Sequence, residues 1–513
     1  MRPLRLRLPT ATAWAKSGAW TPASLGAHLS GTRLTVKRSV ENPWFMYTAS
    51  GQEAELLADQ TPPTDTCSIS ARDFLDALTD GPPYLYYTSP VAEHAALPAL
   101  VPGWEALAAD SAYLHAAAPI LACEPWMQWW VGSGGATTQA HYDVADNLFV
   151  QLHGRKEFWL FPPDAALCLH VYPDAHPRAR KSQVCLERPD AAQHPMVAAL
   201  PEPLRVVLEP GDALAIPAFW FHHVVARSAS VSVNIFSESA VKLAAAEPLG
   251  LALPLHATWP DALKRDGLTL LVGRLLRLLQ LREDSISISE ARSQSQSRLR
   301  EDSISISEAR SGQPTARGCG DGRRRAAWDA RLLLRQHVAS RFQPLRQKDA
   351  LGGAGTPRTA EGVPQHGSSP TAVSAQSVAG RRRRRAAPAP SSLSELVPSL
   401  EEHAALCAES FDRLRLAALR VGHAHRERWH DAAAAAAAAS SVDAPAAAPH
   451  SRGWDVLDDE AADDAYWTGV RDLTIMHLVE LWAFRLFGAE RLDDELSRLA
   501  EHVAESMARG GPG

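Results

Sequence analysis

Three side chains from two separate stretches of the sequence have the types and spacing to hold a metal ion together. His141 and Asp143 lie two residues apart in a run of alternating polar and apolar residues. A β-strand points residues i and i+2 to the same face, so this imidazole and this carboxylate would lie side by side. In the second stretch, His222 follows the aromatic run Phe219–Phe221. Two histidines and one carboxylate leave one face of a metal open, as in the non-haem Fe(II) oxygenases that bind a cosubstrate and O₂ there.

The spacing of His141 and Asp143 is not specific by itself. A chain with 20 histidines and 58 acidic residues is expected to contain such triplets by chance, and His425 and Glu427 repeat the spacing in a stretch that predicts a helix. The surrounding strand pattern favours the first triplet. Two alternatives remain open. The histidines could be hydrogen-bonded core residues of a binding barrel, or His223 could replace His222 as the third ligand.

The two stretches resemble the JmjC type of cupin-like Fe(II)/2-oxoglutarate-dependent hydroxylases. The resemblance is carried by HYDVADNLFVQLHGRKEFWLFPP, LEPGDALAIPAFWFHHVV and VSVNIF, and it extends over Trp20–Ser239. Within the family, these segments are similar to the tRNA wybutosine-synthesising hydroxylase and to the asparaginyl hydroxylase that acts on hypoxia-inducible factor. The resemblance implies a mainly β fold. This fold is a double-stranded β-helix (a jelly-roll or cupin barrel) with an α/β approach before it and helices after it.

The same resemblance implies a set of site residues. The cofactors would be Fe(II), 2-oxoglutarate as cosubstrate, and O₂. The metal ligands would be His141, Asp143 and His222, the first histidine of its pair. The residues that bind the cosubstrate would be Lys156, Thr138, Asn147, Asn234 and Tyr84. Lys156 would hold the distal carboxylate, because a lysine that faces a barrel interior needs an anion. The alternative for Lys156 is a solvated position beside Arg155 in the turn.

The implied activity is hydroxylation of a C–H bond, coupled to oxidative decarboxylation of 2-oxoglutarate to succinate. The segments AHYDVADNL and IPAFWFHH favour a wybutosine-type modified tRNA nucleoside as the substrate. A protein side-chain hydroxylase or a histone-demethylase-like enzyme is the first alternative. The second is a catalytically idle JmjC-like scaffold that binds its partner through an arginine-rich segment.

Strand-like apolar runs separated by turn residues fill the sequence from Thr138 to Phe236, which is typical of a barrel or sandwich. Between them, Tyr172–Pro203 is a loop long enough to suggest a function. We expect the domain boundaries to be as follows: a catalytic domain at 19–245, a helix packing on the barrel at 246–282, a disordered low-complexity insert at 283–392, and a helical region at 393–510 with a poly-Ala/Pro linker near 431–450.

The predicted insert has an unusual composition. The sequence LREDSISISEARS occurs at 281–293 and again at 299–311, and the arginine run Arg381–Arg385 follows among Gly, Ser, Ala and Pro. Such a segment cannot bury enough apolar surface to offset the entropy lost on ordering. Within the insert, only 326–338 is expected to form an isolated helix.

Composition narrows the class of protein. The net charge of −6 is unevenly distributed, because the predicted insert is basic and the segment after it is acidic. Six cysteines without a CxxC pair suggest reduced intracellular thiols. The first forty residues hold seven Lys/Arg and no acid, but residues 19–38 already look like the start of the enzyme domain, so we expect the cytoplasm or nucleus rather than an organelle. No apolar run approaches the ~20 residues that span a bilayer, so no membrane partner is expected. The expected partners are tRNA or a protein substrate, and a second copy of the chain through the C-terminal helices.

Overall fold

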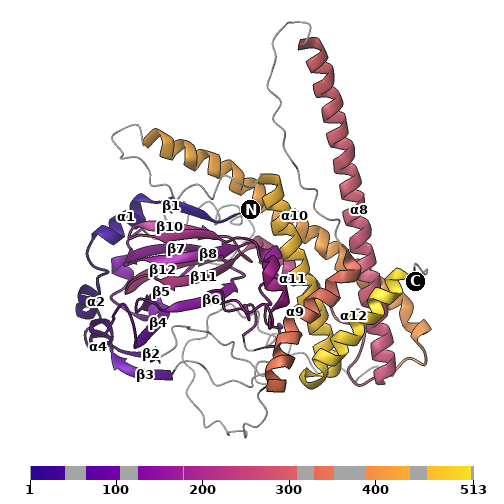
Figure 1. The fold of residues 1–513 in the computed structure, drawn as a ribbon, viewed down its shortest axis with the longest axis horizontal. Helices are drawn as coiled ribbons and strands as arrows, with labels where there is room; N and C mark the ends of the chain where they lie inside the picture. The colour runs from indigo at the N-terminus through magenta and orange to yellow at the C-terminus, as the bar shows by residue number, and fades with distance from the viewer. Residues whose placement is uncertain are drawn as a thin grey trace. The chain divides into compact units, whose positions relative to one another are not determined.

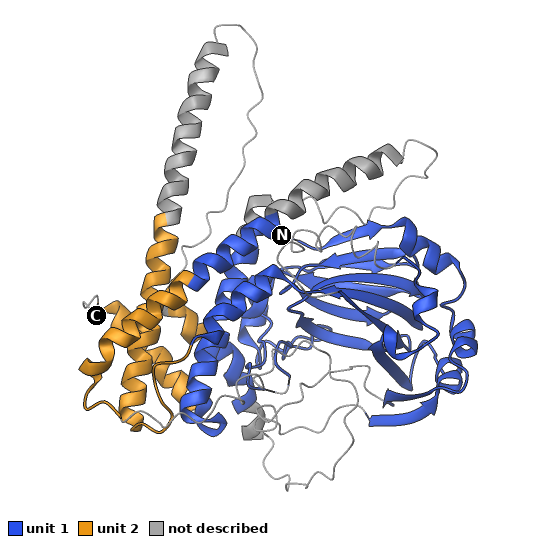
Figure 2. Cartoon of the chain, turned by 180° about the vertical axis from the view of Figure 1, so that it is seen from behind, with its two compact units in different colours: residues 1–251, 337–385, 410–493 blue, residues 252–336, 386–409, 494–513 orange. Residues whose placement is uncertain are grey.

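The computed structural model describes residues 2–40, 65–103, 125–176, 178–308, 329–351, 389–439 and 459–509. The chain divides into two compact units, which Figure 2 colours separately. Unit 1 comprises Met1–Leu251, His337–Arg385 and Ser410–Asp493, and unit 2 comprises Ala252–Gln336, Ala386–Glu409 and Asp494–Gly513. The predicted metal ligands all lie in unit 1.

Two antiparallel sheets form the centre of unit 1 (Figure 1). Among the described residues, the eight-stranded sheet has the order β1 (Leu4–Arg7), β10 (Asp212–Ile216), β7 (Asp146–His153), β12 (Ser230–Ser237), β5 (Trp126–Gly132), β4 (Tyr84–Pro90), β2 (Arg33–Ser39) and β3 (Asp65–Ser70). The four-stranded sheet in the same part of the chain has the order β6 (Thr137–Tyr142), β11 (Phe221–Ala226), β8 (Lys156–Phe161) and β9 (Leu204–Leu208).

Side chains from the two sheets meet between them. The rings of Phe149 in β7 and Phe158 in β8 contact edge to face, with centroids 4.8 Å apart. Lys156 Nζ in β8 donates to Ser232 Oγ in β12 over 3.0 Å. These contacts join opposite walls, so the sheets enclose one interior. The predicted jelly-roll or cupin barrel is confirmed.

The N-terminal boundary of the barrel was predicted too late. β1 pairs with β10 from Leu4↔Ala215 to Arg7↔Asp212, which places it in the large sheet before the predicted start at residue 19. Arg5 and Arg7 also pair with the fully buried carboxylate of Asp212. The strand was missed because its apolar residues, Leu4 and Leu6, are too few to give a periodic signal.

Helices surround or follow the barrel. In unit 1 they are α1 (Pro9–Lys16), α2 (Pro22–His28), α4 (Ala71–Asp76), α7 (Ala240–Gly250) and α11 (Asp459–Phe487). Unit 2 contains α8 (Asp261–Glu308) and all but the first two residues of α12 (Leu492–Ala508). Two further helices, α9 (Ala330–Leu351) and α10 (Leu393–Ala439), each begin in unit 2 and end in unit 1. None of the helices that the structure describes combines the length and apolar character needed to cross a membrane.

The expected disorder of 283–392 is wrong for two segments. α8 continues as helical backbone to Glu308, through the first copy of the duplicated sequence and most of the second. α9 spans 330–351 and buries Leu333, Leu334 and Phe342. The isolated helix expected at 326–338 is thus present from Ala330, but it is longer than expected and is packed. The expected linker near 431–450 is likewise helical as far as Ala439, because alanine is the strongest helix former; its remainder, and Arg381–Arg385, lie outside the described residues.

A buried charge cluster ties α9 to the barrel side of unit 1. Arg341 Nη1 in α9 donates to Asp174 Oδ2 over 2.8 Å and to Glu480 Oε1 of α11 over 2.5 Å. The side chains of Arg341 and Glu480 are each 1% exposed. Two neutral bonds join the same elements: His170 Nδ1 bonds the Ser340 carbonyl oxygen, and Gln183 Nε2 donates to that of Arg341. α9 therefore fixes the long loop that carries Asp174 and Gln183.

Replacing Arg341 with methionine should destabilise unit 1 strongly, because two carboxylates then remain buried without their cation. Breaking a buried ion pair from one side costs about 3–5 kcal/mol. Arg346→Met is the matched control: Arg346 lies in the same helix and pairs with Asp493, but its side chain is 52% exposed. Exposed pairs contribute about 1 kcal/mol or less. Equal unfolding free energies of the two variants in urea would contradict the importance of the buried cluster.

Candidate metal centre

The three predicted ligands come together through the pairing of β6 with β11. His141 and His222 are directly opposed in this antiparallel pair, and their ring centroids lie 4.2 Å apart. Asp143 follows β6 in a short loop, where its carbonyl oxygen accepts a hydrogen bond from Phe219 N over 2.7 Å. His222 Nε2 lies 3.6 Å from Asp143 Oδ2, and one ligand atom from each of the three residues lies within 4.8 Å of the others. The three side chains are therefore close enough to share one ion.

Both imidazoles are oriented for ligation through Nε2. His141 Nδ1 bonds the carbonyl oxygen of Gln139 over 2.9 Å, and His222 Nδ1 bonds that of Trp220 over 3.1 Å. A carbonyl only accepts, so each Nδ1 carries the proton and each Nε2 keeps its lone pair. Backbone partners of this kind fix the tautomer of histidines that bind metals.

The charges around the site also suit a cation. Burial lowers the pKa of His141, which keeps this imidazole neutral near pH 7. Burial would raise the pKa of Asp143, but the neighbouring His141, His222, Arg180 and Lys181 together lower it. A neutral imidazole beside an ionised carboxylate is the protonation state that a metal requires.

A β-bulge brings Thr138 to the same face as His141. Val224 pairs with Thr138 and His222 with His141, so two steps along β11 match three along β6. Residues three apart in a regular strand would face opposite sides, and the extra residue of a bulge reverses this. Thr138 therefore points into the barrel, as its expected role requires.

Tyr86 is the tyrosine that contacts Thr138, with the two hydroxyl oxygens 3.3 Å apart. Tyr84, which we expected in this role, lies two residues earlier in β4, where its ring packs closely over Gly135. We therefore move the expected cosubstrate contact from Tyr84 to Tyr86. Sequence alone could not separate the two because both face the interior and the register of β4 was unknown.

Lys156 faces the interior and is 4% exposed. Its Nζ donates to Ser232 Oγ and lies 5.2 Å from the ring centroid of Phe149. Among the described residues no carboxylate forms an ion pair with it. Burial lowers the pKa of Lys156 to about 7. The solvated alternative for this lysine is therefore wrong, because its side chain is buried inside the barrel.

Asn147 and Asn234 lie next to each other on the wall of the large sheet. Asn234 Nδ2 donates to Asn147 Oδ1 over 2.9 Å, and both residues are buried. The Oδ1 atom of Asn234 has no hydrogen-bond partner among the described residues. A buried acceptor without a donor costs stability unless a bound molecule or water completes it. Both amides are thus placed to meet a polar ligand, as expected.

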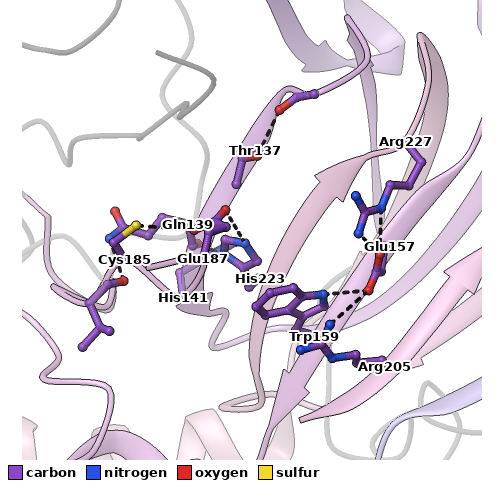
Figure 3. Close-up of polar contacts among 12 residues, drawn as sticks. Thr137, Gln139, His141, Glu157, Trp159, Cys185, Glu187, Arg205, His223 and Arg227 are labelled. Carbon is purple, nitrogen blue, oxygen red and sulfur yellow. Dashed lines mark hydrogen bonds and ion pairs between the residues drawn. The ribbon is translucent and has the colours of Figure 1, made fainter. Parts of the chain in front are cut away.

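His223 lies on the opposite face of β11, away from the metal side. Figure 3 shows Glu187 reaching this ring, and the distance from His223 Nε2 to Glu187 Oε1 is 3.0 Å. The ring of Trp159 packs beside the His223 ring, with centroids 5.2 Å apart, and the Arg205 guanidinium stacks on the Trp159 ring. His223 is thus engaged outside the barrel, and the structure groups only His222 with His141 and Asp143. Sequence reasoning did not identify Glu187 as its partner.

Part of the chain, including the barrel, is similar to known proteins. Residues 11–241 match the family model described as "Cupin-like domain". The chain is similar to tRNA wybutosine-synthesizing protein 5 of Homo sapiens (38% identity over 107 residues; 21% of this chain and 32% of the relative) and of Danio rerio (37% over 134 residues; 25% and 38%). It is also similar to the lysine-specific demethylase JMJ31 of Arabidopsis thaliana, with 33% identity over 114 residues (22% and 21%).

These matches span about a third of the length of the wybutosine-synthesizing relatives and about a fifth of the demethylase. The family model covers most strands of the two-sheet barrel and all three residues of the histidine–aspartate–histidine group. Residues 11–241 of the chain therefore form a cupin-like domain.

Proposed function

We propose that this protein is an Fe(II)- and 2-oxoglutarate-dependent hydroxylase. The observation that carries the proposal is the presence, in one barrel interior, of a three-residue metal site and a buried lysine without a carboxylate partner. A scaffold that only binds would not need to keep a desolvated cation beside such a site, because burying an unpaired charge is costly. The idle-scaffold alternative is therefore disfavoured.

The chain's own residues suit the two cofactors. His141, Asp143 and His222 would hold Fe(II) through two nitrogens and one oxygen, the donor set of non-haem iron oxygenases. Lys156 would pair with the distal carboxylate of 2-oxoglutarate. When bound, Fe(II) and 2-oxoglutarate would react with O₂ and so supply the oxidant for C–H hydroxylation, with succinate and CO₂ as co-products; one oxygen atom of O₂ would enter succinate and the other the product. The protein's contribution is to orient the reactants and to leave one metal face open.

The substrate that we propose is a modified tRNA nucleoside of the wybutosine type. The support is the similarity to the tRNA wybutosine-synthesizing relatives, which falls on the cupin-like domain. A protein side chain is the second candidate, because a relative named as a lysine-specific demethylase matches as well. Both relatives are matched over a minor part of their length.

Purified protein should bind about one Fe(II) per chain and convert 2-oxoglutarate slowly without a substrate. His141→Ala and Asp143→Ala should abolish both, because each removes one of three ligands. His223→Gln is the matched control: it changes the adjacent histidine on the outer face, and it should retain the metal. Colorimetric iron analysis and succinate detection give the two readouts. Retention of iron and turnover in either ligand variant would rule out this site.

Lys156→Ala should weaken 2-oxoglutarate binding while Fe(II) affinity stays near wild type. Removing one partner of a desolvated charge pair costs roughly 2–5 kcal/mol, or on the order of thirty-fold to several thousand-fold in affinity. Lys156→Arg should recover part of this. Lys242→Ala serves as the control, because Lys242 is a buried lysine that already pairs with Glu238 over 2.5 Å. A change of less than about threefold for Lys156→Ala in an anaerobic titration would exclude the anchor role.

The pKa of Lys156 gives this prediction a pH dependence. Since burial lowers that pKa to about 7, the free protein at pH 8 holds Lys156 mostly neutral. Pairing with a carboxylate favours the ammonium form, so binding at pH 8 should take up nearly one proton and affinity should fall as pH rises above about 7. Calorimetry in buffers of different ionisation heat measures the uptake. Lys156→Arg stays charged and should show none; equal uptake in both proteins would point to another group.

Cells that lack this protein should accumulate a tRNA nucleoside lighter by one oxygen atom. Mass spectrometry of their tRNA nucleosides and of their proteome distinguishes the candidates. Re-expression of the wild type should restore the oxygenated nucleoside, whereas His141→Ala should not. Unchanged tRNA together with loss of hydroxylation or demethylation on a protein side chain would support the second candidate instead.

A further inference from the structure

A segment of the long loop, Arg178–Ser182, lies along the free edge of β6. Ser182 N donates to the carbonyl oxygen of Ala140 over 2.8 Å, and Tyr142 N donates to that of Arg180 over 3.2 Å. These two bonds flank His141 on the strand. The segment therefore extends the small sheet by a short piece of backbone on the side opposite β11.

This pairing places Lys181 directly opposite His141, as an isolated antiparallel bridge. Directly opposed residues of an antiparallel pair project to the same face, with Cβ atoms about 5 Å apart. His222 occupies the equivalent position on the other side of His141. The side chains of His222, His141 and Lys181 thus form one row across the small sheet, on the metal side.

The backbone around Lys181 is held by several bonds at once. Arg180 has φ 68°, a left-handed conformation that a residue with a Cβ adopts at a cost. Lys181 N donates to the carbonyl oxygen of Arg178 over 3.1 Å, and Tyr172 N donates to that of Lys181 over 2.9 Å. Strained residues persist where surrounding contacts over-determine them, often at ligand sites.

The ammonium of Lys181 has no partner in the part of the chain that the structure describes. It forms no hydrogen bond and no ion pair there, although the residue is half-buried. Asp143 is the nearby acid, and it is engaged with His222 in the metal site. Two other buried cations of unit 1 do have carboxylates: Lys242 pairs with Glu238 and Arg341 with Glu480.

Further positive charges surround this position. Arg178, Arg180 and Lys37 add to the effect of burial in lowering the pKa of Lys181 to about 7. Lys37 is opposed to Tyr86 in the pairing of β2 with β4, so it faces the interior from the large sheet. Clustered cations attract anions. Lys156 lies on β8, at the opposite side of β11 from β6, so Lys181 is a second and separate cation at the metal site.

We propose that Lys181 binds an anionic group of the substrate, a phosphate or carboxylate, beside the open face of the metal site. The inference rests on the proposed function and deepens it: the long loop contributes the residue that selects a negatively charged substrate. For a tRNA, the anion is either a backbone phosphate near the target nucleotide or a carboxylate on the modified nucleoside.

The test is the affinity of the Co(II)-loaded full chain for fluorescent tRNA, measured by anisotropy for wild type, Lys181→Met, Lys181→Arg and Lys16→Met. The tRNA comes from cells that lack this protein. Losing one charge-assisted hydrogen bond should weaken binding by Lys181→Met about tenfold to a hundredfold. Lys181→Arg keeps the charge and should bind nearly as wild type. Lys16 is exposed on α1 and controls for net charge, so its variant should bind unchanged.

An unmodified tRNA transcript separates the two sources of the anion. If Lys181 contacts a phosphate, Lys181→Met should lose the same factor on both tRNAs, and the slope of log Kd against log salt should decrease by about 1. If Lys181 contacts the nucleoside carboxylate, the loss should appear only with the cellular tRNA. Either pattern supports the proposal.

Three results would overturn the proposed role of Lys181 in substrate binding. Equal affinity of wild type and Lys181→Met for both tRNAs would remove Lys181 from recognition while leaving the tRNA assignment intact. Loss of Co(II) by Lys181→Met, seen in its visible absorption, would show that the lysine acts on Asp143. No binding of either tRNA by the wild type would refute the tRNA assignment, and the role of Lys181 as its anchor would fall with it.

Discussion

The pairing of β6 with β11 is the contact on which the site depends. It sets His141 opposite His222, and the bulge within it turns Thr138 to the same interior face. Shifting this pair by one residue would exchange the interior and exterior faces of one strand. His223 would then replace His222 on the metal side, although it now meets Glu187 outside. Register, and not the mere presence of three ligand types, makes the metal centre.

Two lysines of unit 1 lack the carboxylate partner that a buried cation in a packed core normally has. Lys156 and Lys181 have no carboxylate partner in the described structure, and Lys181 lies directly opposite the metal ligand His141. Elsewhere in unit 1, Arg341 is fully buried but neutralised by Asp174 and Glu480. Arg341 therefore stabilises the fold, whereas we propose that Lys156 and Lys181 bind anionic ligands.

Much of the barrel could be predicted from sequence because its strands are apolar runs between recognisable turns. The metal ligands and Lys156 followed from their spacing and from the resemblance. Contacts between segments distant in sequence could not be predicted in the same way. Tyr86, and not Tyr84, contacts Thr138, because this contact depends on the register of β4 with its neighbouring strands, which the sequence does not specify. The packing of α9 and its continuation beyond residue 338 could not be predicted, because Arg341 looks like solvated chain until Asp174 and Glu480 are seen around it. Deleting 283–392 would remove that helix.

The central claim is that His141, Asp143 and His222 surround one metal ion with an open face. Anomalous diffraction from crystals grown with Mn(II) tests it most directly. The account predicts one strong peak bonded to Nε2 of both histidines and to a carboxylate oxygen of Asp143, with the Nδ1 atoms still on the Gln139 and Trp220 carbonyls. A peak bonded to His223, or ligation through Nδ1, would contradict the register and orientation described above.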